Sequence, residues 1–227
     1  MLIPSDRHTR EDLECWRELE AGDRVHGATI DRKIDQAIDR IRSFADEPCY
    51  CSVSWGKDSV VVAHLVSIAD SRVPLGHLII RATTAPNPDS KRVRDNYLPT
   101  SGQRYVEVDG RATKQHDFAR LRSAFGIGRS INGVRAQESG DRRMSRLIHG
   151  VATDAVCRPI IDWTTDDVFG YLARFALPVH PAYAMLGGGR YDRQWIRVAS
   201  LGGERGRGMG RAEWEREYYG DVLRRRA

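Results

Sequence analysis

The sequence has 227 residues, enough to bury a substantial hydrophobic core, and this length predicts one main domain with or without appendages. Its hydrophobic content of 41% is ordinary for a soluble globular protein, and no window approaches the roughly 18 uninterrupted apolar residues of a membrane helix, which argues against a membrane protein. The net charge of +5 favours a partner that carries phosphate groups, either a nucleotide or a polynucleotide.

The first 27 residues predict a polar helix that ends near Gly22 and forms an appendage to the main domain. The beginning of the chain is charged and lacks the apolar segment of a signal peptide, so we expect a cytoplasmic protein that makes no membrane contact. The main domain is expected to span 28–183, and 184–227 is expected to hold glycine- and arginine-rich loops and a C-terminal helix.

Within the main domain, segments with helical spacing of apolar residues alternate with short runs of strand formers. Because parallel neighbours in a sheet need crossover connections, this alternation predicts an α/β fold with an open, doubly wound, mainly parallel sheet and helices on both faces. The predicted strands are 49–54, 77–83, 104–109, 129–136 and one that begins at 157. The predicted helices are 29–44, 59–69, 90–98, 113–125, one that begins near 164, and 212–226.

The cysteines form neither a C-x-x-C pair nor a cluster with the spacing of a metal site. We therefore expect free or buried thiols in a reducing compartment, with no zinc ion and no iron–sulfur cluster. The four residues are Cys15, Cys49, Cys51 and Cys157.

The stretch SVSWGKDS, residues 52–59, joins the end of a predicted strand to the start of an apolar helix. Its serines and its glycine are small enough to let backbone N–H groups face an anion, and Lys57 and the helix start add positive charge. This combination predicts a phosphate or pyrophosphate site at the edge of the sheet. The common P-loop pattern would need a glycine at Cys51 and a serine or threonine at Asp58, so that kind of site is excluded.

The same stretch resembles the PP-loop of the adenine nucleotide alpha hydrolase superfamily, in the form found in phosphoadenosine phosphosulfate (PAPS) reductases and in the small subunit of bacterial ATP sulfurylase. Two later stretches, GVRAQESGDRR at 133–143 and RPIIDWTTDDVFGYLARFALPVHPAY at 158–183, are similar to further elements of that branch. The ordered matches cover about residues 48–183. They imply a HUP-like, Rossmann-like fold that binds ATP together with Mg²⁺.

The resemblance implies that the loop holds the β- and γ-phosphates of the nucleotide or the departing pyrophosphate, with Lys57 neutralising the charge that develops. Asp58 fits either a Mg²⁺ ligand or a capping residue of the helix. Arg135 is expected at the end of a strand, where its guanidinium can reach a phosphate or sulfate. Glu138, Arg142 and Arg143 follow it in a loop or a first helical turn, and these three also fit a surface ion-pair cluster.

The catalytic candidates are therefore Lys57 and Arg135, and the metal candidate is Asp58. The residues of 158–183 with helical spacing are expected to pack in the core rather than to catalyse, namely Trp163, Val168, Tyr171 and Leu172. The residues expected to bind the nucleotide are Ser52, Ser54, Gly56, Lys57, Asp58, Ser59, Arg81, Gly133, Arg135, Glu138, Ser139 and Arg142.

Reduction of PAPS in this family depends on a C-terminal cysteine inside an E-C-G-(I/L)-H motif, and the sequence has neither that motif nor a cysteine after Cys157. We therefore expect an ATP-dependent nucleotidyltransferase that cleaves ATP between its α- and β-phosphates and releases pyrophosphate, in sulfur metabolism or sulfur modification. Two alternatives stay open. One is a sulfonucleotide enzyme similar to PAPS or APS reductase, and the other is a non-catalytic nucleotide-binding protein associated with nucleic acid.

The acceptor of the adenylyl group is a small sulfur compound, sulfate or a nucleic acid, and the sequence does not choose among them. A protein partner subunit or a homo-oligomer is compatible with the resemblance. The arginines near the end of the chain either neutralise nucleic-acid phosphates or form a solubilising tail, because glutamates alternate with them. These arginines are Arg205, Arg207, Arg211, Arg224, Arg225 and Arg226.

Overall fold

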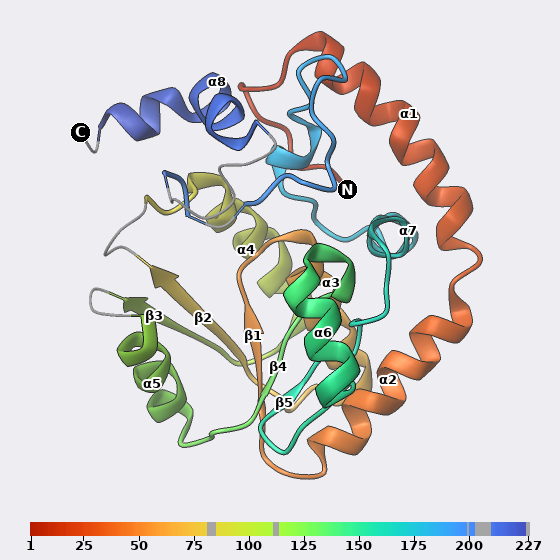
Figure 1. The fold of residues 1–227 in the computed structure, drawn as a ribbon, viewed down its shortest axis with the longest axis vertical. Helices are drawn as coiled ribbons and strands as arrows, with labels where there is room; N and C mark the ends of the chain where they lie inside the picture. Colours follow the sequence, from red (N-terminus) through yellow and green to blue (C-terminus); the bar gives the residue numbers. More distant parts are fainter. Residues whose placement is uncertain (81–84, 111–113, 199, 203–209, 226–227) are drawn as a thin grey trace.

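The fold is built on one sheet of short strands, seen in a computed structural model that describes residues 1–80, 85–110, 114–198, 200–202 and 210–225. Within these residues the strand order is β3-β2-β1-β4-β5, and neighbouring strands pair in parallel (Figure 1). The predicted parallel α/β class is thereby confirmed. The strands are β1 (Tyr50–Val53), β2 (Leu75–Ile80), β3 (Tyr105–Gly110), β4 (Ser130–Ile131) and β5 (Val156–Cys157).

The chain builds the sheet outward from its central strand in two directions. From β1 it crosses to β2 and β3 on one side, and it then returns to add β4 and β5 on the other side. The direction of winding therefore reverses between β1 and β4, and the loops that leave these two strands diverge. Ligands of open α/β sheets bind at such a reversal, which directs attention to the loops after Val53 and Ile131.

Helices cover both faces of the sheet, as the alternation of elements predicts (Figure 1). The helices are α1 (Arg10–Gly27), α2 (Asp31–Ala45), α3 (Lys57–Ala69), α4 (Pro88–Ser101), α5 (Lys114–Phe125), α6 (Gly140–His149), α7 (Thr165–Arg174) and α8 (Arg211–Arg224). Two 3-10 turns, η1 (Ala136–Glu138) and η2 (Pro181–Ala184), join them. None of the helices in the described part of the chain is both long and apolar enough to cross a membrane.

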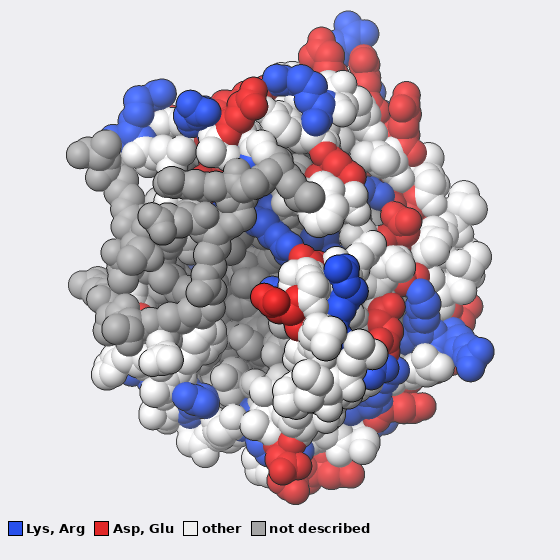
Figure 2. All heavy atoms as spheres, viewed as in Figure 1, with Lys and Arg blue, Asp and Glu red and all other residues white. Residues whose placement is uncertain are grey.

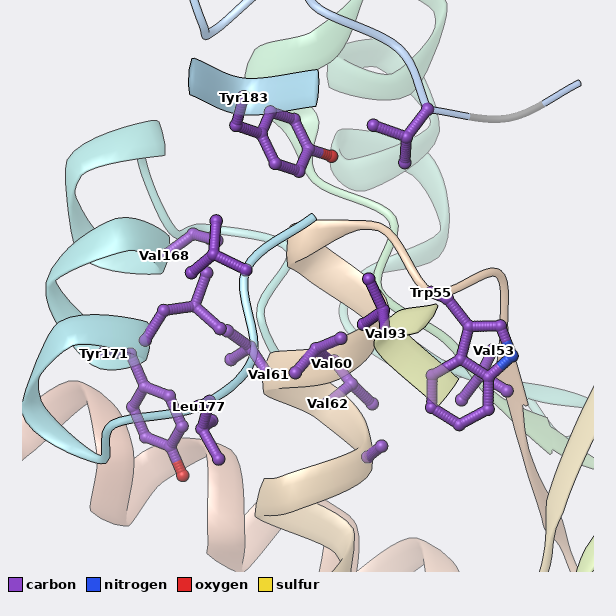
Figure 3. Packing of buried hydrophobic residues seen from close by; sticks show 14 of the residues in the cluster. Val53, Trp55, Val60, Val61, Val62, Val93, Val168, Tyr171, Leu177 and Tyr183 are labelled. Carbon is purple, nitrogen blue, oxygen red and sulfur yellow. The ribbon is translucent and has the colours of Figure 1, made fainter. Parts of the chain in front are cut away.

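The core is divided by the sheet into two clusters. Neighbouring residues of a strand point to opposite faces, and Tyr50 accordingly packs with Leu121 of α5, whereas Cys51 belongs to the larger cluster. The larger cluster contains Val61 of α3, which is apolar on all sides as a buried helix is, and Val168 of α7 (Figure 3). The packing role predicted for four residues is confirmed by their burial, namely Trp163, Val168, Tyr171 and Leu172.

The fourth strand is shorter than the sequence predicts, and this moves Arg135. The prediction was a strand over 129–136, but β4 ends at Ile131. The side chain of Asn132 accepts a hydrogen bond from the backbone N–H of Val134 (3.2 Å), which turns the chain out of the sheet. Arg135 is therefore the residue that precedes η1, and its predicted place at a strand end was wrong.

The N-terminal helix is longer than predicted, because α1 continues past Gly22 to Gly27. A glycine inside a helix costs about 1 kcal/mol relative to alanine, and the packing of α1 along α7 offsets this cost. Gly27 meets the backbone of Gly170 in α7 so closely that neither position has room for a side chain. The predicted end near Gly22 was wrong because this tertiary contact outweighs the local preference.

Candidate functional site

A cleft of about 1000 Å³ lies where the winding of the sheet reverses, between the loops that follow β1 and β4. Figure 2 shows a hollow near the centre of one face, with Lys and Arg atoms at its wall. The described charged residues that line the cleft are the cations Lys57, Lys91, Arg94, Arg142, Arg197 and Arg211 and the carboxylates Asp58, Glu107 and Glu138. Because the cations outnumber the carboxylates, the cleft attracts an anionic ligand.

The loop after β1 closes on itself at the start of α3. The hydroxyl of Ser59 donates to the carbonyl oxygen of Gly56 (3.0 Å) and accepts from the backbone N–H of Ser54 (3.2 Å). Gly56 is the N-cap of α3 and has no side chain to satisfy the first N–H groups, and the first turn of α3 lines the cleft. The positive end of the helix is therefore turned toward any ligand of the cleft, as an anion site requires.

Lys57 is the buried cation of this loop. Only 1% of its side chain is exposed, and its Nζ lies 3.3 Å from Oδ2 of Asp58 and 5.0 Å from the ring centre of Tyr183. The backbone N–H of Lys57 donates to the hydroxyl of the same tyrosine (3.2 Å). Burial lowers the pKa of Lys57, while Asp58 acts in the opposite direction. A cation removed from water in this way interacts strongly with a phosphate that enters the cleft.

Arg135 lies behind the loop and does not line the cleft. Its side chain is 1% exposed, and its Nε donates to Oδ1 of Asp58 (2.5 Å). Its Nη1 donates to the side-chain oxygen of Gln137 (2.8 Å) and to the carbonyl oxygen of Trp163 (3.3 Å). The guanidinium thus fixes Asp58 and the loop in the present structure, and a direct contact between Arg135 and a phosphate stays a prediction.

Asp58 is held between two cations. Its Oδ1 accepts from Arg135 and its Oδ2 faces Lys57. Burial alone would raise the pKa of Asp58, but Lys57 and Arg135 together hold it below its ordinary value. The carboxylate is therefore charged at neutral pH, and it anchors the lysine at the first turn of α3.

Glu138 joins two further cations at the wall of the cleft. One carboxylate oxygen of Glu138 contacts Arg142 of α6 and the other contacts Arg197. Burial lowers the pKa of Arg142, and the neighbouring charge of Arg197 lowers it further. Ser139 is the N-cap of α6 and accepts from the backbone N–H of Arg142 (3.2 Å), so its role here is to start the helix that carries this arginine.

Two glycines permit the close approach of the segments that build the site. A Cβ atom at Gly133 would lie 2.8 Å from the carbonyl carbon and oxygen of Asp58. A Cβ atom at Gly56 would lie 2.9 Å from Cγ2 of Val198 and 3.2 Å from the hydroxyl of Tyr183. The backbone of the loop is thus packed directly against the loop after β4 and against the chain near residue 198, which only glycine allows.

Trp55, which the sequence analysis did not select, supports the loop from the side of β2. Its φ of 61° is unusual for a residue other than glycine, and such a conformation costs on the order of 1–3 kcal/mol. The buried indole offsets this cost, because its Nε1 donates to Nδ1 of His77 (3.2 Å) and its ring packs against Tyr97 and Tyr105.

We expect Trp55→Phe to lower the free energy of unfolding by about 1–2 kcal/mol, because it removes the hydrogen bond from Nε1 to His77 and leaves a smaller ring in the same space. Binding of pyrophosphate should weaken as the loop relaxes. Urea unfolding and titration calorimetry measure the two effects. Trp195→Phe is the matched control, because Trp195 is 40% exposed, and it should change neither quantity. Equal effects of both substitutions would contradict the role given to Trp55.

Most residues predicted to form the site line this one cleft. Arg135 and Ser139 lie outside the lining, and Arg81 lies outside the residues that the structure describes. Sequence reasoning missed Tyr183 and Arg197; the tyrosine closes the stretch 158–183 that resembles the family, whereas no motif marks the arginine. The predicted residues that line the cleft are Ser52, Ser54, Gly56, Lys57, Asp58, Ser59, Gly133, Glu138 and Arg142.

Comparison with known proteins relates the chain to PAPS reductases. No family model matches the chain. It is 25% identical over 220 residues to the phosphoadenosine 5'-phosphosulfate reductase of Xanthomonas oryzae pv. oryzae, which covers 85% of this chain and 89% of that protein. The reductase of the same name from Alkalilimnicola ehrlichii is 30% identical over 94 residues, or 41% of this chain and 38% of that protein.

Among solved structures, the FMN adenylyltransferase of Candida glabrata in complex with FAD and inorganic pyrophosphate is similar with a TM-score of 0.51. The two are 14% identical, and the match covers 73% of this chain and 68% of that one, so it supports the fold alone. The similarity to the Xanthomonas reductase extends over most of both chains and agrees with the loop found at the reversal of the sheet. These findings relate the chain to the PAPS reductases, whose PP-loop the stretch at residues 52–59 resembles.

Proposed function

We propose that the enzyme binds ATP with its phosphates at the PP-loop, cleaves it between the α- and β-phosphates, and transfers the adenylyl group to an acceptor. The observation that carries this proposal is the excess of positive charge at the loop. Four cations and two carboxylates meet there, namely Lys57, Arg135, Arg142, Arg197, Asp58 and Glu138. The uncompensated positive charge, carried in part by the buried Lys57, suits the pyrophosphate portion of a nucleotide.

In this reaction a nucleophile of the acceptor forms a bond to the α-phosphorus while the bond to the bridging oxygen breaks, and the electron pair leaves with pyrophosphate. In this proposal Lys57 neutralises the negative charge that grows on the leaving group, which its position at the start of α3 supports. Arg142 and Arg197 can exchange Glu138 for phosphate oxygens. The acceptor is a small sulfur compound, sulfate or a nucleic acid, as expected from the sequence.

For Mg²⁺, the contacts of Asp58 are informative. Both of its oxygen atoms already face cations, Arg135 at 2.5 Å and Lys57 at 3.3 Å. Mg²⁺ is commonly bound by few protein carboxylates and by the phosphates of the substrate. We therefore favour a Mg²⁺ ion that enters with ATP, and a positioning role for Asp58 on Lys57.

The test is a pyrophosphate exchange assay with an acceptor panel of sulfate, sulfur-containing metabolites, tRNA and DNA. The purified enzyme with Mg²⁺ and ATP should incorporate labelled pyrophosphate into ATP when the right acceptor is present, and complete turnover should release pyrophosphate and an adenylylated product or AMP. Release of ADP and phosphate instead would refute cleavage between the α- and β-phosphates. Binding of ATP with no exchange under any acceptor would favour the non-catalytic alternative.

Pyrophosphate affinity should depend on pH through Lys57. Burial holds the pKa of Lys57 below the ordinary 10.5, and only the protonated amine carries the charge that attracts phosphate. The affinity should fall as the pH rises through this lowered pKa, and binding in that range should take up a proton. Titration calorimetry over a series of pH values below the ordinary 10.5, in buffers of different ionisation enthalpy, measures both. In Lys57→Arg the charge persists at higher pH, so the fall should disappear from this range; an identical profile would contradict the assignment.

A second candidate, reduction of a sulfonucleotide, is favoured by the names of the curated relatives. The position of the thiols argues against it in this chain, since none of the four cysteines lines the cleft. Burial raises the pKa of Cys49 to about 11 and that of Cys157 to about 12, which keeps these thiols protonated and unreactive. Release of sulfite from PAPS in the presence of a dithiol reductant would support this candidate over adenylyl transfer.

The nucleic-acid alternative rests on the arginines near the end of the chain. Within the described part, Arg211 donates to Glu215 (2.8 Å) in an ion pair with little exposure, and Arg224 ends α8. Arg205, Arg207 and Arg226 lie outside the described residues. DNA and RNA binding that stays flat from low to moderate salt would remove this alternative.

A further inference from the structure

Part of the cleft is formed by residues 186–198, which we call the covering segment. Ile196, Arg197 and Val198 line the cleft, and Val198 is the residue that leaves no room for a side chain at Gly56. The described residues of the covering segment form turns but no helix or strand, so no backbone ladder fixes their position. The contacts that hold the segment must therefore come from other parts of the chain.

Some of these contacts come from Tyr218 and Glu217 of α8, and the others come from two acidic residues of α1. Near the start of the covering segment, Asp12 accepts from the backbone N–H of Leu186 (2.9 Å) and of Gly188 (3.4 Å). Further along, the two oxygens of Asp23 accept from the two terminal nitrogens of Arg193 (2.6 and 2.7 Å). Asp12 is 0% exposed and Asp23 is 4% exposed. Carboxylates are buried to this extent only when hydrogen-bond partners satisfy them. The covering segment supplies such partners to Asp12 and Asp23 of α1.

The pair between Asp23 and Arg193 fixes a direction as well as a distance. The guanidinium donates through its forked end to Asp23, and its carbon lies 4.0 Å from the ring centre of Phe169 in α7. Because the planar guanidinium of Arg193 is hydrogen-bonded at its edge and stacked on one face, its orientation is fixed. Arg193 precedes Arg197 by only four positions. The fixed orientation of Arg193 therefore limits the positions that the backbone of 194–197 can take beside the cleft.

We infer that Asp23 is a positioning residue of the phosphate site: through Arg193 it places Arg197 and Val198 at the PP-loop, although Asp23 itself does not line the cleft. A buried ion pair contributes little net stability compared with apolar residues of similar volume, but it selects one arrangement. The ligand in this inference rests on the proposed function, whereas the hold of Asp23 on the covering segment does not.

The test removes both charges at once, in the double variant Asp23→Leu with Arg193→Met, so that no buried charge loses its partner. Hydrogen exchange of the free enzyme should become faster at the amides of 194–198 and stay unchanged in the sheet. Titration calorimetry should show pyrophosphate affinity lowered by about 10-fold, the scale of one charge-assisted contact. The matched control, Glu20→Gln with Arg24→Gln, removes an exposed ion pair from the same helix and should alter neither measurement.

A second arm separates positioning from general support. When Arg197→Gln is already present, adding the double variant should lower the pyrophosphate affinity by less than a further factor of about 2, because its effect passes through Arg197. An undiminished loss in that background, or unchanged exchange at 194–198, overturns the inference. Failure of the wild-type enzyme to bind pyrophosphate refutes the proposed function, while the exchange result still decides whether Asp23 holds the segment. If the double variant does not fold, Arg193→Lys keeps the charge, loses the fork and gives the same readouts.

Discussion

Lys57→Met is expected to weaken binding of pyrophosphate and ATP by about 100-fold or more and to abolish pyrophosphate exchange. Methionine keeps the apolar stem of the side chain and removes the charge that lies 3.3 Å from Asp58. Asp58 keeps its hydrogen bond from Arg135, so its carboxylate stays paired and the loop stays folded. Because burying an ammonium group is itself costly, the free energy of unfolding should stay within about 1 kcal/mol of the wild type. Titration calorimetry and thermal unfolding measure the two quantities.

The control for this substitution is Lys91→Met. Lys91 also lines the cleft, but its side chain is 69% exposed and pairs with Asp95, so its loss should change the affinity by less than about 3-fold. Equal losses in the two variants would mean that the cleft attracts anions only through a diffuse positive field. Wild-type affinity in Lys57→Met would remove the PP-loop from the proposed site.

Gly133→Ala should affect both stability and binding. The added methyl group would lie 2.8 Å from the carbonyl carbon and oxygen of Asp58, and backbone atoms cannot yield as a flexible side chain can. Either the loop after β4 or the first turn of α3 must shift, which should cost about 2–3 kcal/mol of unfolding free energy and displace Lys57 from the cleft. Urea unfolding gives the first quantity and pyrophosphate titration the second.

Gly128→Ala is the matched substitution for this experiment. Gly128 lies before β4 whereas Gly133 follows it, and a Cβ atom at Gly128 would meet nothing within 4 Å. The substitution should be neutral or should stabilise the fold by up to about 1 kcal/mol, because alanine restricts the unfolded chain. If Gly133→Ala behaved in the same way, the close approach of the two loops would not be needed for the site.

The PP-loop could be predicted from the sequence because its chemistry is local. Small residues, a lysine and a helix start follow one another within residues 54–59, and no distant contact is needed to recognise an anion site there. The parallel sheet could be predicted for a related reason, because the alternation of helices and strands is visible in the order of the sequence segments. The reversal between β1 and β4 then brings the loop and Gly133 together without further information.

The partners of the loop could not be predicted, because they depend on distant contacts. The strand formers around Arg135 suggested a longer strand, but the turn at Asn132 ends β4 early and directs the guanidinium to Asp58. Arg197 comes from a segment with no regular pattern, and it meets the cleft through its pair with the distant Glu138. In the sequence, Asp23 looks like an ordinary charged residue of a polar helix. Its burial is explained by its ion pair with Arg193, which only the structure reveals.

The contacts between the two ends of the chain have a consequence for how the enzyme is made. Arg7 pairs with Asp221 across 214 positions, and Asp12 accepts from Tyr218 across 206 positions. Contacts of such long range slow folding, and these cannot form until Tyr218 and Asp221 have left the ribosome. The strands of the sheet lie between residues 50 and 157 and can assemble earlier, whereas α8 joins the N-terminal region last. The final step of folding would thus bring together the first and the last helix of the described chain.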